Sequence, residues 1–93
     1  MEKLSLLQIE EELQTLNGWE YSGEFIEKSF QFGTFKETFS LMTRIAFECE
    51  LQEHHPNWSN VYNSLHIKLN THDVGGITTN DFLLARTIEA IVG

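Results

Sequence analysis

Apolar side chains recur every three or four residues in three segments of the chain, and this is the spacing of one face of an α-helix. The first predicted helix runs from about Leu6 to Leu16, and the third from about Thr79 to Val92. The third helix is expected to bury Phe82, Ala85, Ile88 and Val92. Between them, a second helix is expected to bury one continuous apolar stripe, formed by Phe35, Phe39, Met42, Ala46 and Cys49.

The start of each predicted helix carries the same signal. A hydroxyl residue stands three positions before an amide or acidic side chain, and the pairs are Ser5 with Gln8, Thr34 with Glu37, and Thr78 with Asp81. In a capping box at this spacing, each side chain binds a backbone N–H group near the other residue. The pattern therefore predicts where the three helices begin.

Two other segments alternate between apolar and polar positions, as half-buried β-strands do. Residues 19–32 contain the turn signal Ser22-Gly23 inside such an alternation, which predicts a β-hairpin. Residues 61–70 alternate in the same way and predict one long strand, or two strands with a bend near Asn63.

The order of these elements predicts an α+β fold. An antiparallel sheet of about four strands would be covered on one face by three helices, in the order α-β-β-α-β-β-α. The 93 residues are expected to form a single domain, residues 1–93. The other face of the sheet would bear some of Phe25, Ile26, Phe30 and Phe32, and we expect a second copy of the chain to cover it.

Composition narrows the class of protein. Six Lys and Arg against 14 Asp and Glu give a formal charge of -8, and no basic cluster is present, so direct nucleic-acid binding is not expected. No run of residues approaches the roughly 18 apolar residues of a membrane span. Cys49 is the single cysteine and is expected to be buried, which fits a reducing compartment. We expect a cytoplasmic protein.

Two adjacent histidines, His54 and His55, precede Pro56, the one proline of the chain. Proline disfavours helical geometry for the residue before it, so the second helix should end at or before His55. If helical geometry extends through His54, Glu50 lies one turn earlier on the same face, and its carboxylate can orient the imidazole of His54.

Further polar candidates follow the predicted strand. His72 comes directly after the strand, and Asp81 opens the third helix beyond a loop that contains Gly75-Gly76. His66 falls in mid-strand on the polar side, and we assign it no role. Three histidines and a carboxylate are also a common metal-ligand set. Because neighbouring extended residues point to opposite sides, His54 and His55 would not easily share one ion, and no bound metal is expected.

The segment EHHPNWSNVYNSLHIKLNTHDVGGITTND, residues 53–81, resembles the signature of the pterin-4a-carbinolamine dehydratase family. An acid stands four residues before His-His-Pro, an aromatic residue lies two positions beyond the proline, and Thr-His, a glycine-containing loop and an Asp follow the strand. The matching residues are Glu50, His54, His55, Pro56, Trp58, Tyr62, Thr71, His72, Gly76, Thr78 and Asp81. The upstream Gly-Trp, the hairpin and the Phe-rich helix extend the resemblance over nearly the whole chain.

This resemblance implies the dehydration of 4a-hydroxytetrahydropterin to quinonoid dihydropterin, which recycles the cofactor of aromatic amino acid hydroxylases. The hydroxyl leaves as water and a ring N–H proton is lost, so the reaction needs one proton donor and one proton acceptor. Histidine can serve as either near neutral pH. The resemblance implies no cofactor, and it implies a homodimer or homotetramer.

The resemblance also implies roles for individual residues. His54 and His72 are the acid and base candidates, with the assignment between them open. His55 would position the pterin, and Asp81 would fix and polarise a histidine. The remaining substrate contacts would come from Glu50, Trp58 and Thr71. An alternative function is a non-catalytic interaction protein of the same fold, because some relatives also bind transcription factors through the surface of self-association.

Overall fold

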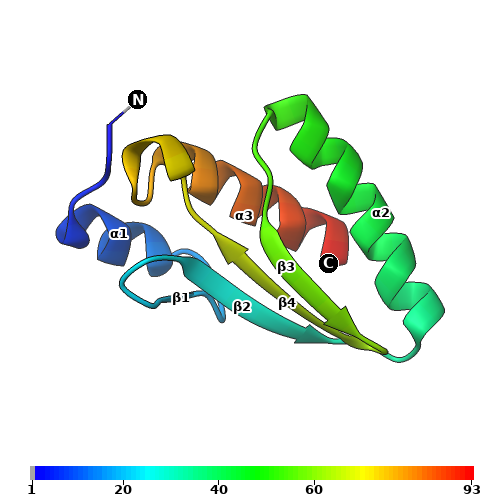
Figure 1. The fold of residues 1–93 in the computed structure, drawn as a ribbon. Coiled ribbons are helices and arrows are strands. Elements are labelled where there is room, and N and C mark those ends of the chain that lie inside the picture. The colour runs from blue at the N-terminus through cyan, green and yellow to red at the C-terminus, as the bar shows by residue number, and fades with distance from the viewer. Residues whose placement is uncertain (1) are drawn as a thin grey trace.

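The computed structural model describes residues 2–93, and its elements follow the predicted order (Figure 1). Three α-helices and four strands are joined by short turns. Their bounds are α1 Leu6–Leu13, β1 Glu20–Tyr21, β2 Ile26–Gln31, α2 Phe35–Gln52, β3 Asn57–Val61, β4 Ser64–Leu69, a 3-10 turn η1 at His72–Val74, and α3 Thr79–Val92. The predicted α+β fold class is confirmed.

The four strands form one antiparallel sheet in the order β1-β2-β4-β3. The predicted hairpin is present, with Tyr21 paired to Ile26 across the turn. The second alternating segment, residues 61–70, contains β4 and only the last residue of β3, because the chain turns at Tyr62, whose φ is 51°. The rest of β3 lies before this segment and was not predicted. Asn63 stands in this turn and binds the backbone of Phe32 at the end of β2. The bend predicted near Asn63 therefore separates the two strands.

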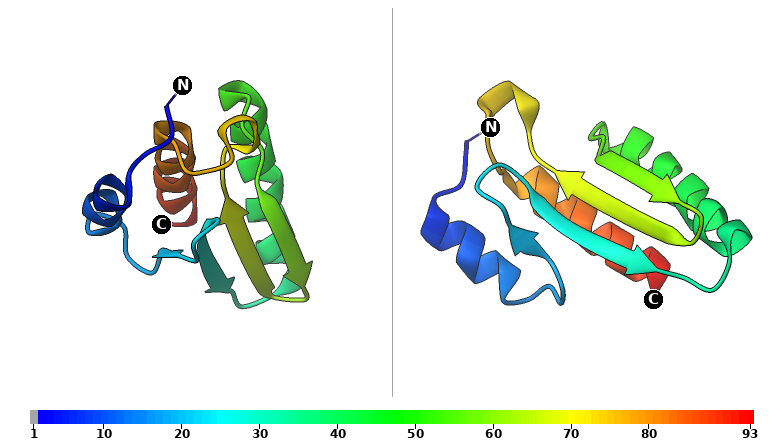
Figure 2. Two further views of the ribbon diagram at one scale, coloured as in Figure 1. Left: turned by 60° about the vertical axis from the view of Figure 1, so that its left-hand side comes forward. Right: turned by 60° about the horizontal axis from the view of Figure 1, so that its bottom comes forward.

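The helices lie on one side of the sheet, with α2 and α3 behind β2, β4 and β3 in the right-hand view of Figure 2. Alternate residues of β2 and β4 point towards the helices, and α3 supplies the apolar residues opposite them. The core consists of Ile9, Leu16, Trp19, Ile26, Phe30, Ile45, Cys49, Leu65, Ile67, Leu69, Ile77, Phe82, Leu84, Ala85 and Ile88. Of the four core residues predicted on α3, three are buried and Val92 is half-buried.

Hydroxyl side chains cap all three helices at the predicted positions. Ser5 and Thr78 take part in full capping boxes, and Thr34 accepts a hydrogen bond from the backbone N–H of Glu37. Helix α1 ends at Leu13, three residues earlier than predicted. After Leu13 the backbone forms tighter turns, and the hydroxyl of Thr15 donates a hydrogen bond to the carbonyl of Glu12.

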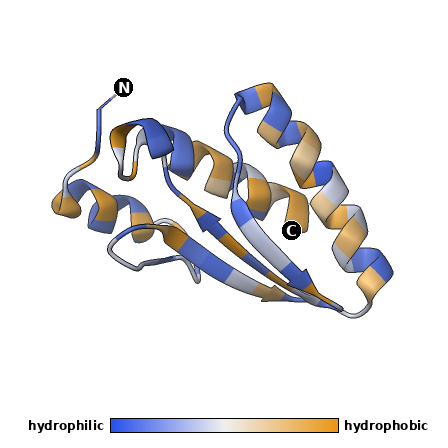
Figure 3. Cartoon of the chain, in the orientation of Figure 1, coloured by the Kyte–Doolittle hydropathy of each residue, from blue (hydrophilic) through white to orange (hydrophobic). Residues whose placement is uncertain are grey.

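The prediction for the buried face of α2 is partly wrong. Thr38, Ile45 and Cys49 are buried, whereas Phe35, Phe39 and Ala46 of the predicted stripe are exposed. Apolar residues recur along the whole of α2 (Figure 3), and Phe47 and Leu51 are also exposed. Because more than one side of α2 is apolar, its sequence does not determine which side meets the sheet.

The open face of the sheet is mainly polar, so the prediction of an apolar face there is only partly right. Ile26 and Phe30 point towards the helices, and Phe32 stacks on Phe30. Phe25 has the opposite parity, and Lys68 lies 4.5 Å over its ring. The opposite face includes Glu27, Ser29 and His66, which bind one another across β2 and β4. None of the helices within residues 2–93 combines the length and the apolar character that crossing a bilayer requires.

Candidate active site

The site begins where α2 ends, in a tight turn that separates the two adjacent histidines. Helix α2 stops at Gln52, before Pro56 as predicted, and Glu53 adopts the left-handed conformation with φ 52° and ψ 42°. The N–H of His54 then donates to the carbonyl of Cys49, which closes the helix end. This turn directs His54 into the protein, where it is buried, and leaves His55 exposed.

His54 points at the first turn of α3. Its Nε2 atom lies 2.5 Å from Oδ1 of Asp81, a residue with no exposed surface. The last turn of α2 is tied to α3 by a hydrogen bond from the Gln52 side chain to the Thr87 hydroxyl. This bond holds the end of α2 against the middle of α3, and the contact of His54 with Asp81 joins the same end to the first turn of α3.

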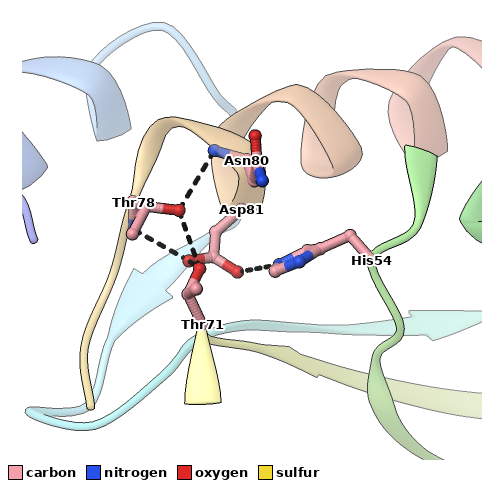
Figure 4. A network of polar contacts seen from close by, with 5 residues as sticks. All are labelled: His54, Thr71, Thr78, Asn80 and Asp81. Atoms are coloured by element: carbon pink, nitrogen blue, oxygen red, sulfur yellow. Dashed lines mark hydrogen bonds and ion pairs between the residues drawn. The ribbon is translucent and has the colours of Figure 1, made fainter. Parts of the chain in front are cut away.

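The second carboxylate oxygen of Asp81 is engaged by the loop before α3 (Figure 4). Oδ2 accepts a hydrogen bond of 2.9 Å from the Thr71 hydroxyl and one of 2.9 Å from the backbone N–H of Thr78. The hydroxyl oxygens of Thr71 and Thr78 are 2.7 Å apart, and Thr78 also accepts from the backbone N–H of Asn80. Asp81 thus completes the capping box of α3 with Thr78 and is also the partner of a buried histidine.

Glu50 does not orient His54. Its Oε2 atom lies 2.6 Å from Nε2 of His55 instead, in an exposed pair. The expected contact depended on helical geometry through His54, whereas the left-handed residue at Glu53 breaks the helical spacing first. The expectation that Glu50 orients the imidazole of His54 is therefore wrong.

Cys49 lies on the buried side of the same helical turn. The pKa of its thiol is raised from 9.0 to about 11, mainly by burial, and the nearby charges of Glu50 and Glu48 contribute to this rise. The last turn of α2 thus carries a buried thiol and an exposed carboxylate at neighbouring positions.

His72 is exposed at the start of η1, directly after Thr71, and within residues 2–93 its imidazole makes no hydrogen bond. Thr71 itself is fixed by its backbone, which forms an isolated bridge with Gly76. The loop therefore holds Thr71 against Asp81 and presents His72 to solvent.

An apolar hollow of about 310 Å³ lies between α2 and β3. It is lined by Phe39, Met42, Thr43, Ala46, Phe47, Glu50 and Trp58. Two of the predicted substrate contacts, Glu50 and Trp58, border this hollow. The structure thus groups the candidate residues into a buried cluster around Asp81 and an exposed hollow beside Glu50.

This arrangement suits proton transfer. A carboxylate that binds one imidazole nitrogen orients the ring and stabilises its protonated form, leaving the other nitrogen to exchange a proton with a ligand. His54 and His55 turn to different carboxylates, and within residues 2–93 no three His, Cys, Asp or Glu side chains gather as ligands for one metal ion.

Thr78 is the residue of this cluster to which the sequence alone assigned no site role. The sequence signal was present, because the capping-box spacing links Thr78 to Asp81. It was assigned only to the start of the helix, since the hydroxyl contact from Thr78 to Thr71 joins two sides of a loop.

Comparison with known proteins agrees with this geometry. The sequence profile of the pterin 4 alpha carbinolamine dehydratase family matches residues 2–91. A protein of Christiangramia forsetii, named provisionally as a pterin-4-alpha-carbinolamine dehydratase, is 56% identical over 92 residues, which cover 99% of this chain and 95% of that protein. A relative of the same provisional name from Prochlorococcus marinus (strain MIT 9515) is 48% identical over 84 residues, 90% of this chain and 88% of its own.

Solved structures show the same fold. The crystal structure of a transcriptional coactivator/pterin dehydratase from Brucella melitensis superposes with a TM-score of 0.95 at 37% identity, covering 99% of this chain and 100% of its own. A pterin dehydratase-like RuBisCO assembly factor of the alpha-carboxysome has a TM-score of 0.68 at 20% identity over 81% of this chain and 87% of its own, which is a likeness of fold alone. The chain therefore belongs to the pterin-4-alpha-carbinolamine dehydratase family, a family named for a hydro-lyase activity.

Proposed function

We propose that this protein dehydrates 4a-hydroxytetrahydropterin to quinonoid dihydropterin and water. The observation that supports this most directly is the buried pair of His54 and Asp81, in a chain that belongs to the dehydratase family. The proposed role is to recycle the tetrahydropterin of aromatic amino acid hydroxylases in the cytoplasm. The buried free thiol of Cys49 fits a reducing compartment.

The proposed reaction is an elimination with two proton transfers. An acid gives a proton to the 4a-hydroxyl as its C–O bond breaks, and a base takes a proton from a ring N–H, whose electrons form the new double bond. His54 and His72 are the proposed acid and base, and Asp81 orients His54. The charges and atoms balance without an oxidant or reductant.

The proposed substrate contacts lie on the exposed side of the site. His55 and Glu50 form a polar pair there, and Trp58 offers an aromatic surface beside the apolar hollow. Thr71 is buried against Asp81 instead, directly before His72 in the chain. A flat, polar-edged heterocycle suits a site that combines hydrogen-bonding groups with an aromatic wall.

The decisive test is a dehydration assay with freshly generated 4a-hydroxytetrahydropterin, from which the spontaneous rate is subtracted. We expect acceleration by the intact protein, and its loss in the His54→Ala/His72→Ala double variant. The same assay after exhaustive chelation should give full activity, because the proposed steps are proton transfers only. A rate equal to the spontaneous reaction would remove the proposed function.

We also propose that the protein is a homo-oligomer and that the exposed aromatic side of α2 forms its interface. Phe35 and Phe39 contact each other there with ring centroids 5.6 Å apart, and Phe47 is 69% exposed. Exposed apolar patches of this kind mark interaction sites. The open face of the sheet is mainly polar, with side chains such as Glu27, Ser29 and His66.

Light scattering tests the interface. The Phe39→Asp/Phe47→Asp variant should be a monomer at micromolar concentration, whereas Ser59→Asp, on the open face of the sheet, should leave the assembly unchanged. A wild-type monomer would contradict the proposal.

A non-catalytic interaction protein is the alternative function. The same exposed aromatic side of α2 favours it, as does the description of the Brucella melitensis relative as a transcriptional coactivator/pterin dehydratase. This alternative would be supported if the chain bound a partner protein and did not itself accelerate pterin dehydration.

A further inference from the structure

Asp81 is fully buried, and three groups contact its carboxylate. The backbone N–H of Thr78 can only donate, so it gives a proton to Oδ2. The hydroxyl of Thr71 donates to the same oxygen, and Nε2 of His54 faces the other oxygen. Hydrogen bonds of this kind favour the ionised form of a carboxyl group. Asp81 also stands in the first turn of α3, where the helix dipole favours a negative charge.

The hydroxyl chain has one satisfactory direction. The N–H of Asn80 donates to the Thr78 hydroxyl oxygen, so the Thr78 proton is free for Thr71, and the Thr71 proton is free for Asp81. If the chain ran the other way, with a proton on Oδ2 of Asp81, the Thr78 oxygen would accept from both Thr71 and the N–H of Asn80. The Thr78 hydroxyl proton would then have no acceptor at a residue with no exposed surface, which is unfavourable.

The direction of the hydroxyl hydrogen-bond chain bears on which ring nitrogen of His54 carries the proton. An ionised carboxylate can only accept, so the proton between His54 and Asp81 belongs to Nε2. In a neutral imidazole only one nitrogen carries a proton, so Nδ1 of His54 has a free lone pair. Within residues 2–93 no protein group binds this Nδ1 atom, which leaves it available to a ligand.

We propose that Thr71 and Thr78 are positioning residues, whose hydroxyl chain keeps Asp81 ionised and fixes neutral His54 in the Nε2–H form, so that Nδ1 exchanges the proton. The kinetic consequence of this inference rests on the proposed dehydratase function, whereas the protonation pattern does not. The backbone bridge of Thr71 with Gly76 holds the chain in place. If either hydroxyl moved away, the Asp81 carboxylate could accept a proton. The His54 imidazole could then change from the Nε2–H to the Nδ1–H tautomer.

Nuclear magnetic resonance of protein labelled with ¹⁵N-histidine tests the protonation pattern directly. Couplings between the ring nitrogens and the carbon-bound protons identify which nitrogen carries the proton, and a His54→Gln variant assigns the signals. We expect Nε2–H for neutral His54 in the wild type. Thr71→Val should shift His54 towards Nδ1–H or a mixture, and Thr71→Ser should restore the wild-type pattern.

Thr78→Val removes the other hydroxyl, but it also removes a helix cap, so Thr71→Val is the primary variant. The histidine signals of His66 serve as the internal control, because its partners Ser29 and Glu27 lie on the opposite face of the sheet. These signals should be identical in all variants. A general loss of structure would change them together with those of His54.

Kinetics provide the second measurement. Thr71→Val should lower kcat by about tenfold or more, with KM nearly unchanged, and Thr71→Ser should recover most of the rate. Wild-type His54 in the Nδ1–H form, or an unaltered His54 pattern and kcat in Thr71→Val, overturns the inference. If the wild type fails to accelerate dehydration, the proposed function is lost, and the resonance measurement still decides the role of the hydroxyl chain.

Discussion

Two histidine–carboxylate pairs stand at neighbouring positions and differ mainly in their contact with water. His54 and Asp81 are 2.5 Å apart, and their side chains are 10% and 0% exposed. His55 and Glu50 are 2.6 Å apart, and their side chains are 63% and 76% exposed. The distances are nearly equal, so distance alone does not distinguish the pairs. Their surroundings do, because water and salt screen an exposed pair far more than a buried one.

From this comparison we propose different functional roles for the two pairs. The buried pair has fixed geometry and several further hydrogen bonds, as a proton-transfer group requires. The exposed pair can rearrange at little cost when a ligand arrives. We therefore expect changes to the buried pair to affect stability and kcat, and changes to the exposed pair to affect substrate binding.

The largest expected effect is on the stability of the buried pair. Asp81→Ala should lower the free energy of unfolding by about 3–5 kcal/mol, because it leaves a buried imidazole, a hydroxyl and an N–H without their partner. Urea unfolding followed by circular dichroism measures this difference. A loss below about 1 kcal/mol would show that Asp81 does not hold the cluster together.

The next largest expected effect is on kcat, which should distinguish the catalytic histidines from His66. His54→Ala or His72→Ala should lower kcat by about 100-fold or more, as removal of a general acid or base does. Steady-state kinetics on the single variants and the His54/His72 double variant measure this, with the spontaneous rate subtracted. His66→Ala is the matched control and should change neither kcat nor KM much. Near-native kcat in the double variant, or equal damage from His66→Ala, would contradict the assigned roles.

Cys49 extends the comparison to a third buried group. Its pKa of about 11, against an ordinary 9.0, leaves about 100-fold less thiolate near neutral pH, and burial also blocks access. Alkylation by iodoacetamide at pH 8 should therefore be at least about 100-fold slower in the folded protein than in urea. Mass spectrometry measures the rate, and equal rates in the two states would show that the thiol is accessible.

The same shift predicts a dependence of stability on pH. A thiol whose pKa is raised on folding contributes stability that is complete below pH 9.0 and is lost as the pH rises towards about 11. Urea unfolding of the wild type should show this loss above pH 9, and Cys49→Ala should lack that part of it.

His55→Ala should act on the exposed side of the site. If His55 positions the substrate, its removal should raise KM more than it lowers kcat. Initial rates over a range of pterin concentrations separate the two parameters. A fall in kcat as large as that of His54→Ala would mean that the exposed histidine also transfers a proton.

The smallest expected effect is on the stability of the exposed pair. Glu50→Gln should change the free energy of unfolding by less than about 1 kcal/mol, and high salt should abolish the difference. Unfolding in low and high salt measures this. A loss comparable to that of Asp81→Ala would remove the distinction between the two pairs.

Much of the fold follows from local signals in the sequence. Hydroxyl residues such as Thr34 and Thr78 satisfy backbone N–H groups within their own turn, so they indicate helix starts without reference to the rest of the chain. Pro56 restricts its own neighbour and limits α2 in the same way. Apolar alternation likewise indicates β2 and β4, because each has one buried face, whereas β3 lies almost wholly outside the predicted segments.

The faces of two elements could not be assigned from local signals. Helix α2 is apolar on more than one side, so contact with the sheet and α3 selects Ile45 and leaves Phe39 exposed. Strand β2 has Ile26 and Phe30 on one parity and Phe25 on the other, and only its pairing with β4 fixes the inner side. Both choices depend on residues distant in the sequence.

The candidate site divides in the same way. The resemblance of the motif brought His54, His72 and Asp81 together as candidates. The pairing within the site depended on Glu53, whose left-handed conformation no simple sequence signal indicates, because glycine usually occupies such a position. One residue with positive φ therefore exchanged the expected partner of Glu50 from His54 to His55.

The left-handed turn at Glu53 also makes the two halves of the site separately variable. A single peptide unit directs one side chain inward and the next outward, so substitutions at His55 or Glu50 can alter the exposed surface while the inward residue stays in register. Lengthening or shortening this turn by one residue is expected to move His54 away from Asp81. Laboratory evolution towards other ligands is therefore expected to accept replacements on the outer positions and to reject insertions or deletions between Gln52 and Pro56.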